Sequence, residues 1–121
     1  MSKPIVGWFE VTGKDGASLQ TFYSSLFDWE VADAGDGSGY GLVAAGEKGI
    51  AGGIGGSQDG GDGGVTFYVE VDDLDRYLAK AEALGGKTVV PPTEIANFGL
   101  WFAFFSDPEG HVVGLSRGAV Q

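Results

Sequence analysis

Hydrophobic residues follow two alternating spacings along this chain, a strand-like spacing of two and a helix-like spacing of three or four. Residues 5–12 carry the β-branched and aromatic residues of a strand. After Asp15, a candidate helix N-cap, the apolar residues Leu19, Phe22, Tyr23 and Leu26 recur on one face of a helix. Strand character returns at residues 29–34. The beginning of the chain therefore predicts a strand, a helix and a second strand.

Between residues 35 and 64 the hydrophobic pattern thins out, because 14 of these 30 residues are glycine. Two short segments, residues 40–43 and 49–51, still carry apolar side chains and predict two thin strands. The scarcity of side chains predicts either open space above the sheet or a poorly ordered half of the molecule.

The second half repeats this order with fuller side chains. Residues 65–71 predict a strand, and Asp72 and Asp73 cap a helix that ends at the glycine pair 85–86. Its apolar face consists of Leu74, Tyr77, Leu78, Ala81 and Leu84. Three further strands are expected at residues 87–90, 100–105 and 111–116.

A shift of 58 residues aligns the two halves. Phe9 then falls on Phe67, Val11 on Val69, and Leu26 on Leu84. Such matches fall at strands, helix ends and turns in the same order, so each half is one supersecondary unit that must pack on its twin. The sequence predicts an α+β fold of two βαβββ modules, with mixed strand pairing and helices on the outer face.

Composition narrows the classes of function. The chain has 121 residues, one domain's worth, and no cysteine, which excludes disulfides, thiolate zinc sites and a cysteine nucleophile. Its net charge of -10 argues against nucleic acid and anionic membranes as partners. The sequence also lacks a long apolar run, so we expect a soluble, cytoplasmic protein.

Several segments resemble one known family. They are Trp8-Phe9-Glu10-Val11, Leu26-Phe27-Asp28-Trp29-Glu30, Val69-Glu70-Val71-Asp72-Asp73 and Asp107-Pro108-Glu109-Gly110-His111. This pattern is similar to the vicinal oxygen chelate superfamily, which includes glyoxalase I, bleomycin-resistance proteins and extradiol dioxygenases. The resemblance implies a single glyoxalase-like domain over residues 1–121, with modules at about 4–57 and 64–117. It also implies a curved, partly open eight-stranded mixed sheet around a cavity, and a homodimer.

The resemblance also indicates where a metal would bind. Metal-dependent relatives place a histidine on the first strand and a carboxylate on the last strand of their modules. These positions correspond to Trp8, Thr66, Gly114 and, through the 58-residue shift, Gly56. One threonine hydroxyl cannot supply the three or more donors that a divalent ion needs. We therefore predict no metal and no cofactor.

Five residues are predicted to bind a ligand. An indole at Trp8 would suit stacking on a small planar or aromatic molecule, or else would fill the vacant metal site as core packing. Glu10 shares the strand face of Trp8 and would be a polar anchor or a base, or would lie at a wet strand end. Thr66, Tyr68 and Trp101 complete the predicted site.

The leading interpretation is a metal-independent protein that binds or sequesters a small molecule, of the glyoxalase/bleomycin-resistance type. A lyase or isomerase is an alternative, with atypical metal donors such as Glu10, Glu70 and His111 or with Glu10 alone as the base. A degenerate dimerisation or regulatory module is a third. His111, the only histidine, is expected to bind the preceding turn rather than to catalyse. No residue is assigned a catalytic role.

Overall fold

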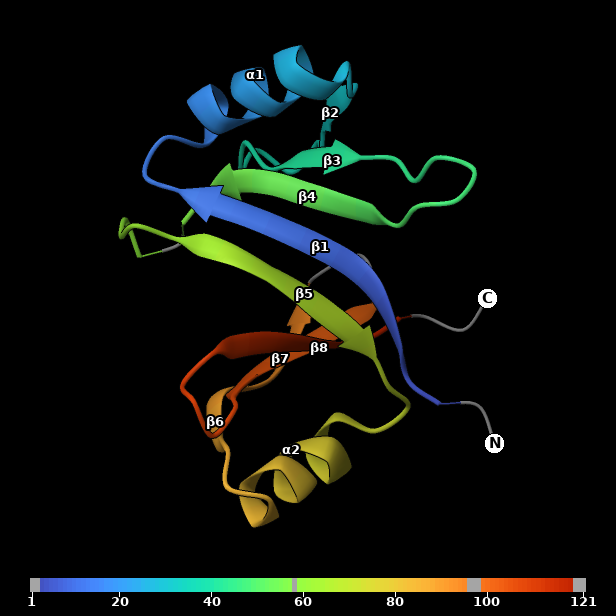
Figure 1. Ribbon diagram of the computed structural model, residues 1–121, viewed down its shortest axis with the longest axis vertical. Helices are drawn as coiled ribbons and strands as arrows, with labels where there is room; N and C mark the ends of the chain where they lie inside the picture. The colour runs from blue at the N-terminus through green and yellow to red at the C-terminus, as the bar shows by residue number, and fades with distance from the viewer. Residues whose placement is uncertain (1–2, 58, 96–98, 119–121) are drawn as a thin grey trace. The chain divides into compact units, whose positions relative to one another are not determined.

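The computed structural model describes residues 3–57, 59–95 and 99–118. Over these residues the chain forms strand, helix, strand, strand, strand, twice in succession (Figure 1). It divides into two compact units, Trp8–Thr66, here the first-half unit, and Phe67–Gln121 with Met1–Gly7, here the second-half unit. The predicted α+β class and the order of two βαβββ modules are confirmed.

The first-half unit holds a four-stranded mixed sheet. Its strands lie in the order β2-β3-β4-β1, with β1 parallel to β4 and the other two pairs antiparallel. Only the first residues of β1 belong to the second-half unit. The elements are β1 (Ile5–Gly13), α1 (Gly16–Phe27), β2 (Val31–Asp33), β3 (Gly41–Val43) and β4 (Ala51–Gly56).

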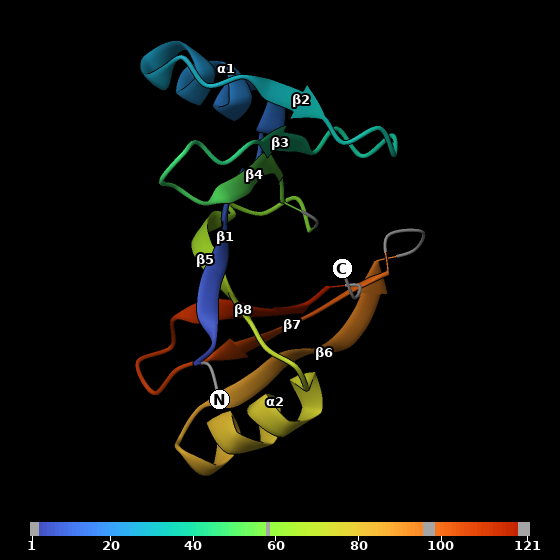
Figure 2. The ribbon, with the colours of Figure 1, turned by 90° about the vertical axis from the view of Figure 1, so that its right-hand side faces the viewer.

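The second-half unit has the same topology with longer strands. Its sheet runs β5-β8-β7-β6, with β5 parallel to β8 and the remaining pairs antiparallel. Figure 2 shows α2 along one face of this sheet. The elements are β5 (Gly64–Glu70), whose first three residues belong to the first-half unit, α2 (Leu74–Ala83), β6 (Lys87–Ile95), β7 (Leu100–Ser106) and β8 (Val112–Arg117).

Both helices begin where the sequence predicts. The carboxylate of Asp15 accepts a hydrogen bond from the Ser18 backbone N–H at 3.0 Å, and Asp73 accepts one from the Arg76 N–H at 3.1 Å. Each bond satisfies a backbone donor that the first turn of a helix leaves unpaired. Neither helix is long and apolar enough to span a membrane, among the residues described.

The second-half unit has a conventional core between helix and sheet. Leu74 and Leu78 of α2 are 5% exposed and pack with Ala103 and Leu115 from the sheet. Half-buried apolar residues surround this cluster, namely Val69, Val71, Tyr77, Trp101 and Phe105. The apolar face predicted for α2 therefore faces the sheet as expected through Leu74 and Leu78.

The first-half unit packs its helix differently. Phe22 and Leu26, which the sequence places on the apolar face of α1, are 56% and 57% exposed in the structure. Instead the Gln20 side-chain amide donates to the Ile54 carbonyl at 2.7 Å, and an added Cβ at Gly16 would overlap the backbone of β4. The helix approaches the strand too closely for a row of large side chains to lie between them.

Aromatic rings cover the glycines of β4. A Cβ at Gly52 would meet the ring of Phe9, and a Cβ at Gly53 would meet the ring of Tyr40. The missing side chains therefore allow rings to lie directly against the backbone of the strand. The space that the glycine-rich sequence predicts to be open is occupied by these rings.

Candidate functional site

The first-half sheet carries a polar and aromatic group on the face opposite α1. Phe9 lies on the α1 side, where its ring centroid is 5.8 Å from that of Trp29, which packs in turn on Phe27 of α1. Because side chains alternate along a strand, Trp8 and Glu10 point to the opposite face of β1. The predicted residues Trp8 and Glu10 thus share one side of the sheet.

A hydrogen-bonded chain joins these two residues through Tyr40. The indole Nε1–H of Trp8 donates to the Tyr40 hydroxyl at 3.1 Å, and that hydroxyl donates to Glu10 Oε1 at 2.9 Å. Tyr40 immediately precedes β3, and its ring reaches back across Gly53 of β4. The glycine at position 53 is what allows the phenol to reach the carboxylate on β1.

The surroundings of Tyr40 determine which atom donates in each of these two hydrogen bonds. Burial of the Tyr40 phenol raises its pKa well above the usual range, and the negative charge of Glu10 raises it further. The hydroxyl therefore keeps its proton at every physiological pH and acts as a donor toward Glu10. The indole N–H of Trp8 is a donor only. Trp8 therefore donates to Tyr40, and Tyr40 donates to Glu10.

Chemically, the Trp8–Tyr40–Glu10 group combines two aromatic rings with one oriented carboxylate. Aromatic rings suit stacking on another planar ring, and a carboxylate suits a polar group at the edge of that ring. A carboxylate held by a phenol is also able to accept a proton from a bound substrate. The group thus fits either a binding site or a simple acid/base site.

The second-half sheet carries an aromatic cluster on the face opposite α2. A Cβ at Gly114 would meet the ring of Tyr68, so this ring also lies over a glycine. Tyr68 packs on Phe104 with centroids 5.4 Å apart, and Phe104 meets Phe102 at 5.8 Å. Thr66, two residues before Tyr68 on β5, is half-buried and shares its side of that strand.

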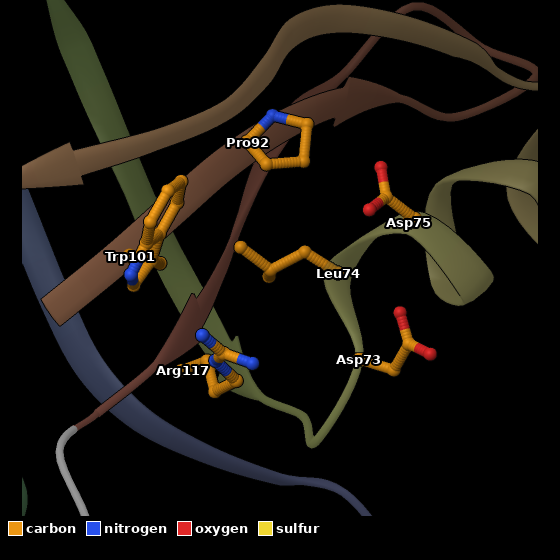
Figure 3. Close-up of a pocket in the computed structure, with 6 residues that line it drawn as sticks. All are labelled: Asp73, Leu74, Asp75, Pro92, Trp101 and Arg117. Carbon is orange, nitrogen blue, oxygen red and sulfur yellow. The ribbon is translucent and has the colours of Figure 1, made fainter.

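Trp101 lies elsewhere. It packs against the core beneath α2 and, with Leu74, Pro92 and Arg117, lines a pocket of about 190 Å³ (Figure 3). Trp101 and Tyr68 therefore occupy opposite faces of the second-half sheet, and the structure does not bring Trp101 together with the other predicted site residues. Strand alternation decides this, because Trp101 has the parity of the buried Ala103 and not that of Phe104.

The strand register corrects one equivalence between the halves. Tyr68 pairs with Gly114, whereas Glu10, 58 residues before Tyr68, pairs with Gly53. The structural twin of Gly114 is therefore Gly53 and not Gly56. The segment from β6 through β7 is longer than the segment from β2 through β3, so the shift of 58 that aligns the first strands and helix caps becomes 61 at the last strands.

Gly53, like Gly56, has no side chain that could donate to a metal. Across residues 3–57, 59–95 and 99–118, no three His, Cys, Asp or Glu side chains gather closely enough to hold a metal ion. His111 is exposed, and its Nδ1 lies 3.0 Å from an Asp107 carboxylate oxygen. A hydrogen bond from the His111 backbone N–H lowers the pKa of Asp107. His111 thus binds its turn, as expected.

Sequence reasoning missed Tyr40. The signal for it was available, since Tyr40 is the one aromatic residue in the glycine-rich stretch 35–64. A ring among glycines is well placed to lie against a strand that lacks side chains. What the sequence did not show is that the hydroxyl would meet Trp8 and Glu10.

Comparisons with known proteins agree on the family. The model of the Glyoxalase/Bleomycin resistance protein/Dioxygenase superfamily matches residues 5–115. The anthracycline biosynthesis protein DnrV of Streptomyces peucetius is 29% identical, over 94% of this chain and 47% of that protein. The putative glyoxylase CFP32 of Mycobacterium tuberculosis is 30% identical, over 89% of this chain and 43% of that protein. The chain thus spans less than half the length of these curated relatives.

A solved structure shares the fold at lower identity. A Streptomyces coelicolor methylmalonyl-CoA epimerase variant, in complex with 2-nitronate-propionyl-CoA, superimposes with a TM-score of 0.64. The sequence identity is 14%, over 98% of this chain and all of that chain. At this identity the similarity shows a shared fold.

Proposed function

The chain belongs to the glyoxalase/bleomycin resistance protein/dioxygenase superfamily, and on this premise we propose that it binds a small planar aromatic molecule without a metal ion. The observation that carries the proposal is the hydrogen-bonded Trp8–Tyr40–Glu10 group on a sheet face opposite the helix. In this group, aromatic rings provide the stacking surface and one oriented carboxylate provides the polar contact.

Residue identity at the family's ligand positions supports metal independence. Trp8 and Thr66 lie at the first-strand positions where metal-dependent relatives carry histidines. Gly53 of β4 and Gly114 of β8 lie at the last-strand positions where those relatives carry carboxylates. Both glycines lie beneath tyrosine rings. A ring in that place also denies an ion the space that it would need.

The nature of one relative favours a polycyclic aromatic ligand. DnrV, at 29% identity, is an anthracycline biosynthesis protein, and an anthracycline contains a planar fused-ring system. The paired rings of Trp8 and Tyr40 suit such a surface. We therefore take 1,4-dihydroxyanthraquinone, a planar fused-ring compound with polar edges, as the probe.

The direct test is calorimetric titration of the probe into protein dialysed against a chelator. The proposal expects saturable binding that is unchanged when zinc, nickel, iron or manganese is added back. Metal analysis of protein purified without a chelator accompanies the titration. Near-stoichiometric metal that survives dialysis, or binding that appears only after metal addition, would overturn metal independence.

A second candidate function is proton abstraction by Glu10. The observation that favours it is the Tyr40 hydroxyl bonded to Glu10 Oε1, because a fixed donor orients the carboxylate that would act as the base. The test is deuterium incorporation from heavy water into methylmalonyl-CoA, the compound named for the epimerase fold neighbours. Exchange that Glu10→Gln abolishes would support this function, and no exchange above the uncatalysed rate would reject it for this substrate.

We also propose that the chain forms a homodimer. Phe22, Leu26 and Phe27 of α1 are each more than half exposed, and large apolar side chains so exposed on one helix favour burial against a partner. A second copy would also bring the assembly close to the length of the curated relatives. Light scattering that reports 12.5 kDa at all accessible concentrations would contradict the dimer.

A further inference from the structure

The pocket beneath the first turn of α2 lies outside the proposed ligand site. It is built within the second-half unit by side chains from α2, β6, β7 and β8 (Figure 3). It lies on the α2 face of its sheet, whereas the Tyr68 cluster lies on the opposite face. Its volume of about 190 Å³ compares with the ~150 Å³ cavity that is known to hold a benzene molecule in another protein. The pocket thus accepts one ring with a short substituent.

Three apolar side chains line this pocket. Leu74 is 5% exposed and belongs to the core, and Trp101 packs against the same cluster. Pro92 lies between Val90 and Thr93, where the register of β6 against β7 shifts. Such an irregularity re-aims the side chains beside it, and a proline costs no ladder hydrogen bond there. Figure 3 shows Pro92, Trp101 and Leu74 around one space.

Charged side chains stand on two sides of these apolar side chains. Asp73 and Asp75 come from the start of α2, while Arg117 comes from the end of β8 (Figure 3). Arg117 lies over the Trp101 ring at 6.0 Å from its centroid, and neither salt bridge found in the described part of the chain includes Arg117. The pocket therefore holds two carboxylates and one guanidinium, a net charge of one negative unit.

From this geometry we infer that the pocket binds a small amine that carries one apolar ring. The ring lies among Trp101, Pro92 and Leu74, and the ammonium group faces Asp75, while the carboxylate of Asp73, which caps α2, adds negative charge nearby. The net negative charge of the lining, in a chain of net charge -10, favours a cation over an anion of the same shape. Arg117 acts against this cation, so its removal strengthens binding. This inference stands apart from the proposed function, because it involves no residue of the Trp8–Tyr40–Glu10 group.

Three compounds with the same phenyl ring and different charge test the inference. They are 2-phenylethylamine, 2-phenylethanol and 3-phenylpropionate, each titrated into the full chain while the indole N–H signals of its three tryptophans are followed by NMR. We expect the amine to move the Trp101 signal saturably, with a Kd on the order of 1 mM for a ligand of this size. The alcohol binds more weakly and the carboxylate most weakly. The Trp8 signal stays in place.

Two substitutions on the pocket rim separate charge from shape. Asp75→Asn removes a carboxylate that does not cap the helix, and it weakens amine binding about two- to fivefold. Arg117→Gln strengthens amine binding by a similar factor. Asp62→Asn, at an exposed residue of the first-half unit that pairs with Lys14, is the matched control and changes nothing.

Several results would overturn the inference. Tighter binding of 3-phenylpropionate, weaker amine binding in Arg117→Gln, or equal affinity for all three compounds would show that the carboxylates do not select the ligand. Absence of a saturable Trp101 shift would remove the site itself. Each of these outcomes leaves anthraquinone binding at Trp8 to be decided by its own titration.

Discussion

The two halves of this protein share an order of elements and differ in how the helix is held to the sheet. In the second half α2 buries Leu74 and Leu78 against Ala103 and Leu115. The residues 58 positions earlier are Gly16 and Gln20, and α1 has no buried residue. It approaches β4 through a glycine, and it bonds to the strand backbone through the Gln20 amide.

The sheets differ in the same way. The edge half of the second sheet is built from β6 and β7 of nine and seven residues, whereas β2 and β3 have three residues each. Glycines of β4 lie under the rings of Phe9 and Tyr40 instead of carrying side chains. The same topology is therefore stabilised by aliphatic burial in one half and by close backbone approach under aromatic rings in the other.

The largest expected effect tests aliphatic burial in the second half. Leu78→Ala removes a 5% exposed core side chain and should lower the free energy of unfolding by about 2–5 kcal/mol. Leu26→Ala, at a position of α1 that is 57% exposed in the single chain, should cost less than about 1 kcal/mol when unfolding is measured at a protein concentration that keeps the chain monomeric. Urea unfolding of both variants measures the difference. Equal losses would show that the two helices are held in the same way.

A glycine substitution tests the close approach in the first half. Gly53→Ala places a Cβ against the Tyr40 ring and should cost about 1–3 kcal/mol of unfolding free energy. Gly56→Ala is the matched control on the same strand, since its Cβ would meet only a carbonyl oxygen at 3.8 Å. It should be neutral or stabilise by up to about 1 kcal/mol. Thermal unfolding that ranks the two variants the other way would refute the role of Tyr40 as a cover for β4.

Removing one hydroxyl has the smallest expected effect on stability. Tyr40→Phe keeps the ring over Gly53 but deletes the bonds to Trp8 and Glu10, at a cost of about 1 kcal/mol. The free energy of unfolding of the wild type should also decrease at high pH. Burial raises the folded-state pKa of Tyr40, so the unfolded chain loses this proton first and the wild type loses stability as pH rises above its unfolded pKa of about 10.

The Tyr40→Phe variant lacks this contribution. Its stability should therefore fall less steeply than that of the wild type when unfolding is measured from about pH 9 upward. Parallel pH curves for the two proteins would mean that the Tyr40 phenol titrates alike in the folded and unfolded states.

Much of the fold could be predicted from the sequence because its signals are local. The Asp15 and Asp73 caps, the glycine pair at 85–86 and the apolar run of β7 each depend on a few neighbouring residues. The packing side of α1 could not be predicted, because Phe22 and Leu26 give the periodicity of a buried face. Gly16 and Gln20 decide the contact through their closeness to β4, which no spacing rule reveals.

The candidate site shows the same division. Strand alternation places Trp8 and Glu10 on one face, and it also separates Trp101 from Tyr68 once the parity of β7 is known. The equivalence of Gly53 with Gly114 depends on the different lengths of the β2–β3 and β6–β7 segments, which a single fixed repeat shift cannot represent. The bond from Tyr40 to Glu10 spans 30 residues, so it lies beyond any local pattern.

Substitution of Trp8 tests whether the sheet face opposite α1 binds a ligand. Calorimetry with 1,4-dihydroxyanthraquinone and thermal unfolding are both applied to Trp8→Ala, with Trp29→Phe, on the α1 face, as the control. If the face opposite α1 binds the probe, Trp8→Ala weakens binding by about 1–3 kcal/mol and Trp29→Phe leaves affinity unchanged. A loss of about 3–5 kcal/mol of stability in Trp8→Ala, with unchanged affinity in the folded fraction, would identify Trp8 as a core residue and exclude it from the ligand site.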